Sequence, residues 1–231
     1  MQDIPLLWIN CDSSVKRAAH MISQCSKFGY NATRIPAITG DKITAKPRYG
    51  LNAYACLLSH LWCQQQLLMN SCVEWVAIAE DDVVFLGKIH PEIIKTAPSD
   101  ATLLQLTTLT GSHYDTCNRR PLWTRSTNGF YGTQLYLVRV PSIAGVFQKA
   151  GIIDVWNYTK QMLPQVPDGL EVADSYTYCM HTAYLCSYPF AYSDISLGSE
   201  LHPEHLEMHQ EGWSAVLSYH RHVKNPYLME M

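Results

Sequence analysis

Short apolar runs alternate along the chain with longer stretches in which apolar residues recur every three or four positions. The apolar run from Ile4 to Asn10 predicts a strand. Apolar residues at helical spacing after Ser13 or Ser14, either of which suits an N-cap, predict a helix that ends at Gly29. A second short strand is expected in 32–40, followed by a polar loop containing Pro and Gly. The N-terminus is therefore expected to form a β-α unit.

The longest helical pattern runs from Ala53 to Asn70 and leads directly into the strand pattern at 73–79. That strand is rich in β-branched and aromatic residues, which is typical of an inner strand in a mostly parallel sheet. It ends in three adjacent acids, Glu80, Asp81 and Asp82.

The second half of the chain repeats this alternation less clearly. Strands are predicted at 101–107, 133–140 and 183–192, and helices at 141–151 and 172–181. The polar stretch 111–132 is expected to be a long loop, which in a compact domain is usually functional or mobile. Beyond Gly198 the sequence is His-rich and weakly periodic, so an irregular C-terminal tail is expected. We predict one α/β domain over 1–231, with a mostly parallel central sheet flanked by helices.

Composition narrows the class of protein. The 231 residues carry 17 basic and 20 acidic side chains, a net charge of −3, which argues against nucleic acid or an anionic membrane as the main partner. The apolar run near the N-terminus is too short for a signal peptide or a membrane span. Eight cysteines include no CxxC pair, which favours buried reduced thiols and a cytosolic location.

The acidic stretch is the main candidate for chemistry. Burying one uncompensated charge costs several kcal/mol, so three adjacent acids between apolar flanks need a cation or water. If the extended backbone continues, Glu80 and Asp82 project to one side and share a hard cation such as Mg²⁺ or Mn²⁺, while Asp81 points toward a hydroxyl or a basic partner. The alternative is a solvated turn. The apolar residues on both sides favour the cation site.

Six blocks of sequence together resemble glycosyltransferase family 25, the lipopolysaccharide and collagen galactosyltransferase group with the GT-A fold, and the related small enzymes of large DNA viruses of algae. The blocks are WINCDSSVKR (8–17), RIPAITG (34–40), YACLLSHLW (54–62), AIAEDDVVF (77–85), GTQLYLVRV (132–140) and VADSYTY (172–178). The resemblance spans roughly residues 4–195. It implies a GT-A-like domain with a nucleotide-binding half, 1–110, and an acceptor half, 111–231. A viral origin would make the location the host cytoplasm.

The resemblance also implies a donor site. Its nucleotide-binding positions fall on Ile9, Asn10, Arg17, Ala37, Ile38, Ser59 and Asp81. Arginine suits bidentate phosphate contact, although Arg17 also fits an ordinary exposed helix residue. Asn10-Cys11 departs from the Asn-Leu that usually ends the family's first strand. Ser59 and His60 would support the diphosphate or the acidic motif, while the alternative for His60 is a satisfied core residue.

For the metal, the resemblance implies Glu80 and Asp82, with Asp82 in contact with the ion. His220 and His222, on one side of an extended C-terminal segment, would add imidazole ligands that suit Mn²⁺, or else form a surface histidine run. Asp174 matches the family's acid near the sugar and would be the general base, although helix capping also explains an acid there. Asp168 and Asp194 are weaker alternatives.

The loop 111–132 would act as a lid over the donor sugar. Trp123 would offer an apolar platform, and Arg119, Arg120 or Arg125 would counter phosphate charge, unless these cations only solubilise the loop.

These features lead to one expected function. It is Mn²⁺- or Mg²⁺-dependent transfer of a hexose from a nucleotide diphosphate sugar, which we expect to be a UDP-hexose, to a glycan or glycoprotein hydroxyl. The resemblance implies that the transfer inverts the anomeric carbon. A metal-dependent phosphohydrolase is an alternative, but the chain has neither a DxDxT-like motif nor a Gly-rich phosphate loop. A second alternative is a non-catalytic module that binds a nucleotide sugar or a carbohydrate.

Overall fold

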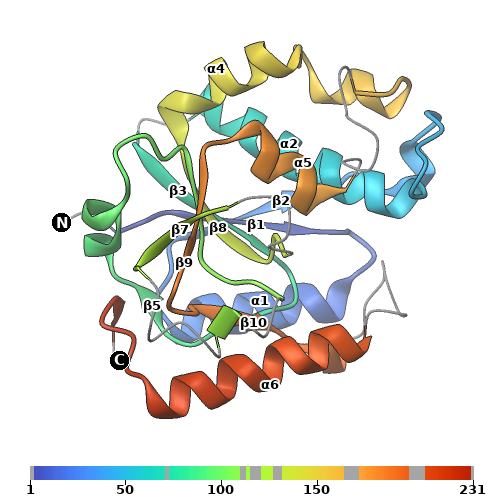
Figure 1. Ribbon diagram of the computed structural model, residues 1–231. Coiled ribbons are helices and arrows are strands. Elements are labelled where there is room, and N and C mark those ends of the chain that lie inside the picture. Colours follow the sequence, from blue (N-terminus) through green and yellow to red (C-terminus); the bar gives the residue numbers. More distant parts are fainter. Residues whose placement is uncertain are drawn as a thin grey trace.

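A seven-stranded sheet runs through the centre of the molecule (Figure 1). The computed structural model describes residues 3–70, 73–109, 113–114, 121–126, 132–163, 172–197 and 206–229. Within these residues the strand order is β2-β1-β3-β8-β6-β9-β7. The strands are β1 (Leu6–Asn10), β2 (Ala32–Pro36), β3 (Trp75–Glu80), β6 (Leu103–Gln105), β7 (Trp123–Arg125), β8 (Leu135–Arg139) and β9 (Ala183–Cys186).

The sheet is mixed but mostly unidirectional. β1 pairs in parallel with β2 and β3, and β6 pairs in parallel with β9, whereas β8 and β7 run antiparallel to their neighbours. Two small antiparallel ladders complete the strands of the described residues: β4 (Val83–Phe85) with β10 (Ala191–Ser193), and β5 (Lys88–Ile89) with β11 (Leu228–Met229). The α/β class with a mostly parallel central sheet is thus confirmed.

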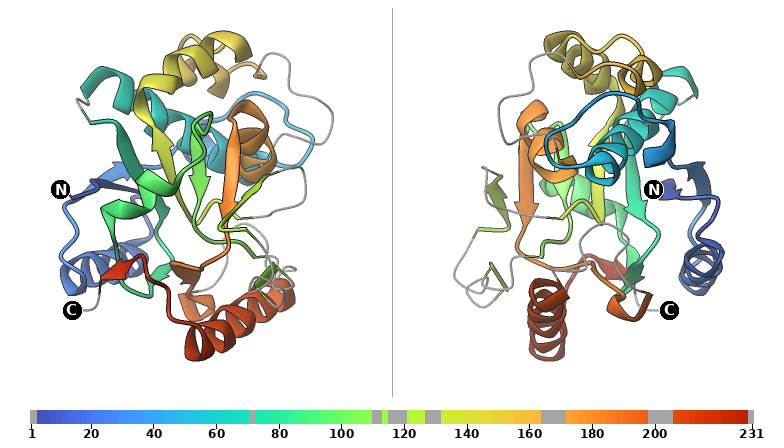
Figure 2. Two further views of the ribbon diagram at one scale, coloured as in Figure 1. Left: turned by 60° about the vertical axis from the view of Figure 1, so that its left-hand side comes forward. Right: turned by 90° about the vertical axis from the view of Figure 1, so that its right-hand side faces the viewer.

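Helices cover both faces of the sheet. α2 (Leu51–Asn70), α4 (Val140–Ala150) and α5 (Ala173–Met180) form one layer, and α1 (Val15–Lys27) and α6 (Leu206–His222) lie on the other side (Figures 1 and 2). Short 3₁₀ segments are η1 (Gly40–Lys42), η2 (Pro91–Thr96), η4 (Val155–Thr159) and η5 (Ile195–Leu197). No helix of the described residues has both the length and the apolar character needed to cross a membrane.

The core follows from the alternation of side chains along β3. Val76 and Ile78 face the layer of α2, α4 and α5, while Trp75, Ala77 and Ala79 face α1. Each large apolar side chain buried in this way contributes about 1.5–3 kcal/mol relative to exposure. This explains the continuous apolar run in the sequence, because a strand covered on both faces has no polar side.

Glycine ends two helices as the sequence predicts. Gly29 follows α1 with φ +61°, and Gly151 caps α4 with φ +69°, conformations that residues with a Cβ adopt only at a cost. Pro141 lies in the first turn of α4, where its missing N–H leaves no helical bond unmade.

Two expectations about irregular segments are wrong. The C-terminal region is not an irregular tail, because α6 spans Leu206–His222 and buries Val216 and Tyr219 against Tyr114. Gly212, which weakens the helical pattern, lets α6 approach the backbone of Leu109, where an added Cβ would lie 2.9 Å from a carbonyl oxygen. The stretch 111–132 is not all loop, because β7 pairs with β9 inside it.

The cysteines of the described residues form no disulfide, and Cys25, Cys63 and Cys186 are buried in the core. Burial raises the pKa of Cys25 to about 11 and that of Cys186 to about 12, so these two thiols stay protonated at neutral pH.

Candidate functional site

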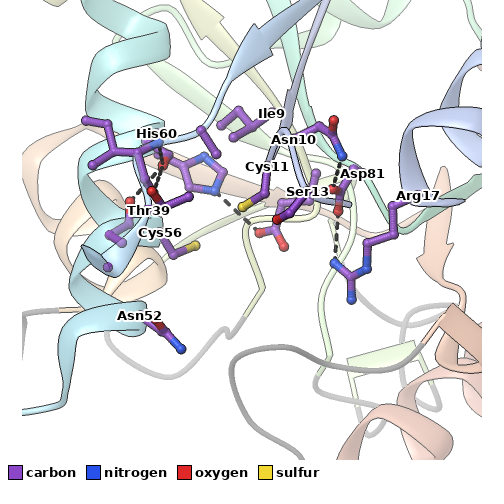
Figure 3. Close-up of a pocket in the computed structure, with 16 residues that line it drawn as sticks. Ile9, Asn10, Cys11, Ser13, Arg17, Thr39, Asn52, Cys56, His60 and Asp81 are labelled. Carbon is purple, nitrogen blue, oxygen red and sulfur yellow. Dashed lines mark hydrogen bonds and ion pairs between the residues drawn. The ribbon is translucent and has the colours of Figure 1, made fainter. Parts of the chain in front are cut away.

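A cavity of about 190 Å³, partly open to solvent, lies where β2, β1 and β3 end at their carboxyl sides (Figure 3). Parallel neighbours place these three strand ends side by side, with Ile9 opposite Glu80 and Asn10 opposite Pro36. The cavity is lined by Ile9, Asn10, Cys11, Ser13, Arg17, Ala37, Ile38, Thr39, Gly40, Asn52, Ala55, Cys56, Ser59, His60, Glu80 and Asp81.

All seven residues expected to bind a nucleotide donor lie around this cavity, together with Glu80. They come from β1, α1, the segment after β2, α2 and the end of β3. Asp82 and Asp174 are not among the lining residues. Strand ends of this kind are where open α/β sheets usually bind ligands.

Asp81 is held by two donors on the cavity wall. Asn10 Nδ2 donates to Asp81 Oδ2 at 2.7 Å, and Arg17 donates to Asp81 Oδ1 at 2.9 Å. Arg34 Nε in turn donates to Asn10 Oδ1 at 2.8 Å and so fixes the orientation of the amide. Burial outweighs these contacts and raises the pKa of Asp81. Asp81 therefore has the basic partner that was expected.

Ser59 uses its hydroxyl within the protein. The Ile38 N–H donates to Ser59 Oγ at 2.8 Å, and the Ser59 hydroxyl donates to the Ala55 carbonyl at 2.7 Å. These contacts tie the segment after β2 to α2. The expected base-pocket residues Ala37 and Ile38 thus owe their position to this serine.

Glu80 lies between a histidine and a threonine. His60 Nε2 is 3.4 Å from Glu80 Oε1, and the Thr133 hydroxyl donates to the same oxygen at 2.7 Å. Burial alone would raise the pKa of Glu80, but His60 and Thr133 outweigh it and hold the pKa below its ordinary value. The expectation that His60 supports the acidic motif fits this contact.

The acidic stretch does not continue as extended backbone. β3 ends at Glu80, and Asp81 and Asp82 form a turn before β4. The expectation that an extended backbone projects Glu80 and Asp82 to one side is therefore wrong. Asp82 Oδ1 is buried with no hydrogen-bond partner. Burial, together with the charge of Glu80, raises the pKa of Asp82 to about 7. The two carboxylates are therefore close enough to repel.

Asp174 lies in the first turn of α5, and its side chain bonds to a residue outside the helix. Its Oδ2 accepts the N–H of Gly132 at 2.8 Å. The carbonyl of Gly132 accepts from Gln105 Nε2 at 3.2 Å and from the Tyr178 hydroxyl. Burial raises the pKa of Asp174, and the charge of Glu80 adds to the rise. Asp174 thus belongs electrostatically to the group that includes Glu80.

The two weaker candidates for the base differ in what the structure says of them. Asp194 Oδ1 accepts from the Ser196 N–H at 2.9 Å, as a cap does, and the Asp194 N–H donates to the Asp82 carbonyl at 2.7 Å. Asp168 lies outside the described residues.

The C-terminal histidines do not fit the expected metal site. His220 and His222 occupy the last turn of α6, not an extended segment, and both are exposed. Residues two apart on a helix do not face the same side. His220 lines a different cavity, with Phe28 and Leu86. We therefore leave both histidines out of the metal site.

Of the residues named for the expected lid, the structure describes Trp123 and Arg125, and it places both away from the cavity. Trp123 donates its indole N–H to Thr96 Oγ1 at 3.0 Å and packs against the part of the core that lies on the α1 face of the sheet. A guanidinium nitrogen of Arg125 is 3.8 Å from a carboxylate oxygen of Asp100. Neither residue lines the cavity. Arg119 and Arg120 lie outside the described residues.

Sequence reasoning missed Cys56 and Thr133 as site residues. Cys56 and His60 are four residues apart on a helix, a spacing visible in the sequence that places both on one face. Thr133 carries no such signal, because its role depends on β8 lying next to β3.

Comparisons with known proteins give distant structural likenesses. No family model matches the chain, and no curated protein sequence matches it. Among solved structures, the chain is similar to a glycosyltransferase involved in glycosylation of the major capsid of PBCV-1 (14% identity, TM-score 0.35, 68% of this chain and 67% of that chain). It is also similar to the galactosyltransferase LgtC in complex with donor and acceptor sugar analogues (11% identity, TM-score 0.38, 79% of this chain and 73% of that chain). A third similar structure is mouse xyloside xylosyltransferase 1 (8% identity, TM-score 0.39, 79% of this chain and 81% of that chain). At such values the likeness carries no assignment of function, and the resemblance to family 25 stays a prediction.

Proposed function

We propose that the chain is a GT-A-like glycosyltransferase that moves a hexose from a nucleotide diphosphate sugar, a UDP-hexose, to a hydroxyl of a glycan or glycoprotein acceptor, with inversion. One observation carries the proposal. Seven residues expected at a donor site, from five separate segments, surround one cavity at the carboxyl ends of three adjacent parallel strands.

The character of the cavity supports a nucleotide donor. Ile9, Ala37 and Ile38 give an apolar wall suited to a base, while Arg17 supplies positive charge suited to a diphosphate.

A divalent cation fits the acidic stretch. Asp82 has a buried carboxylate oxygen without a hydrogen-bond partner, and burial together with the charge of Glu80 raises its pKa to about 7, a rise that a bound cation would oppose. We propose that Glu80 and Asp82 hold Mn²⁺ or Mg²⁺, both of which accept carboxylate oxygens. When bound, the ion would supply positive charge to offset the leaving diphosphate.

The raised pKa of Asp174 suits a general base. In the proposed reaction its carboxylate takes the proton from the acceptor hydroxyl, whose oxygen attacks the anomeric carbon from the face opposite the leaving group. The Gly132 N–H, bonded to Oδ2, orients the carboxylate for this transfer.

The test follows free-nucleotide release from a panel of nucleotide sugars, with and without Mn²⁺. Asp82→Asn and Asp174→Asn keep side-chain shape, and we expect each to lower release from the preferred donor by about 100-fold or more, the loss typical of removing one key electrostatic group. Glu92→Gln is the control, because Glu92 lies in η2 outside the cavity and pairs only with Lys95 among the described residues.

Three outcomes would contradict the proposal. Absence of both binding and release with every donor would remove it. Donor binding without turnover at any metal concentration would favour the non-catalytic module. Phosphate release from simple esters would favour the phosphohydrolase.

A further inference from the structure

Three side chains of different chemistry meet on one wall of the cavity. A ligand atom each of Cys56, His60 and Glu80 lies within 4.8 Å of the other two. Cys56 and His60 are one turn apart on α2 and point toward the cavity in Figure 3, and Glu80 ends β3. The packing of α2 on the sheet therefore brings together a thiol, an imidazole and a carboxylate.

His60 is oriented as metal-binding histidines usually are. Its ring is 1% exposed, and its Nδ1 lies 3.1 Å from the hydroxyl of the fully buried Tyr136. Its Nε2 is buried without a hydrogen-bond partner and faces Glu80 at 3.4 Å. With the proton on Nδ1 and shared with Tyr136, the lone pair of Nε2 points into the cluster.

We propose that Cys56, His60 and Glu80 bind one Zn²⁺ ion through three protein ligands, with the fourth position open to the cavity. Thiolate and imidazole ligands select Zn²⁺ over Mg²⁺, and three ligands with one open position are typical of zinc sites that admit a further ligand. Zinc bonds of about 2.0–2.3 Å require the ligand atoms to draw together, which side-chain rotation can achieve.

This site differs from the proposed Mn²⁺ or Mg²⁺ site in two of its ligands and shares only Glu80 with it. Zinc binding requires no nucleotide sugar and no turnover. Because the cobalt spectrum reports zinc binding and nucleotide release reports glycosyl transfer, failure of one proposal is distinguishable from failure of the other although both sites use Glu80.

The first experiment titrates the metal-free protein with Co²⁺, a spectroscopic substitute for Zn²⁺. We expect one equivalent to bind with a sulfur-to-cobalt charge-transfer band, and Zn²⁺ to displace it. Cys56→Ser should abolish the band and His60→Gln should weaken binding, whereas Cys179→Ser, an exposed cysteine on α5 outside the cavity, should leave both unchanged. Tyr136→Phe should weaken binding about tenfold and keep the band, the effect of losing a group that orients a ligand.

A second measurement uses the unmodified protein, in case a variant does not fold. Zn²⁺ should slow alkylation of Cys56, followed by peptide mass spectrometry, and leave Cys179 unaffected. The proposal is overturned if no metal binds at one equivalent, if the charge-transfer band survives in folded Cys56→Ser, or if Zn²⁺ protects both cysteines equally.

Discussion

The ion pair between Arg17 and Asp81 shows how much the site depends on single residues. The side chains are 14% and 9% exposed, so neither charge is well solvated. Arg17→Ala leaves a buried carboxylate without its cation, and we expect it to lower the free energy of unfolding by about 3 kcal/mol. Urea unfolding followed by circular dichroism measures the change.

The double variant Arg17→Ala with Asp81→Asn separates stability from binding. The neutral amide needs no cation, so most of the lost stability should return, while affinity for the nucleotide should stay low because the cavity still lacks its arginine. Equal stability of Arg17→Ala and the wild type would mean that water already solvates the pair.

His181 predicts a pH dependence of stability. Its ring nitrogens contact Gln64 Oε1 and Thr102 Oγ1, each at 3.1 Å, and burial lowers its pKa from 6.5 to about 4. Between these values the unfolded chain binds a proton that the folded chain excludes, so stability is full above about pH 6.5 and is lost as the pH falls toward 4.

The slope of this loss reaches about 1.4 kcal/mol per pH unit for one proton. Unfolding free energies of the wild type and of His181→Gln, measured across this window, should differ in slope by that amount. Parallel curves for the two proteins would show that His181 does not account for the acid sensitivity.

At the scale of elements, the junction between Gly132 and β8 links the backbone to the site. Gly132 has φ +110°, and an added Cβ would lie 2.2 Å from Gln134 Oε1. Gly132→Ala should therefore shift the N–H that holds Asp174. We expect it to lower the folding equilibrium constant about tenfold or more, and the rate of the proposed transfer by a similar factor.

Gly151→Ala is the matched control for Gly132→Ala. Gly151 also has positive φ, but it caps α4 away from the cavity, so this variant should lose about 1 kcal/mol of stability and keep its activity. Equal losses of activity in the two variants would exclude a specific link between Gly132 and Asp174.

The elements that sequence predicts best are those whose pattern is local. β3 and β8 are nearly continuous apolar runs, and α1 and α4 carry glycine at their ends, so each was predicted within a few residues. α6 was missed because, among its described side chains, a narrow stripe is buried, and because Gly212 serves packing against Leu109. In the sequence alone, such a narrow apolar stripe is weak evidence for a helix, because the surface that it packs on is not visible there.

The residues of the candidate site also divide into those that local sequence indicates and those that depend on packing between distant segments. The acids at the end of β3 drew attention because the end of an apolar strand is visible in the sequence, whereas the residues at the end of β1 came from the resemblance to glycosyltransferase family 25. The hydrogen bond of Thr133 to Glu80 and the closeness of Cys56 to Glu80 were not predicted, because they depend on β8 and α2 packing beside β3. The turn at Asp81 and Asp82 was only the alternative prediction, because the apolar residues on both sides favoured a continued extended backbone.

At the scale of the whole molecule, donor binding should protect segments that are far apart in the chain but adjacent around the cavity. Hydrogen exchange with UDP and Mn²⁺ should slow at 9–11, 37–40, 52–60 and 80–81, and should not change along α6, which contributes no lining residue. Protection confined to α6 would place the nucleotide elsewhere.

The position of β8 has a consequence for synthesis of the chain. β8 lies between β3 and β6 in the sheet, although both of these strands precede it in the sequence. On the ribosome, the apolar strand Trp75–Glu80 therefore emerges with one edge unpaired, and keeps it until Leu135–Arg139 has been made. Unpaired apolar edges promote association between chains. The nascent protein thus passes through a period in which shielding by a chaperone favours correct assembly.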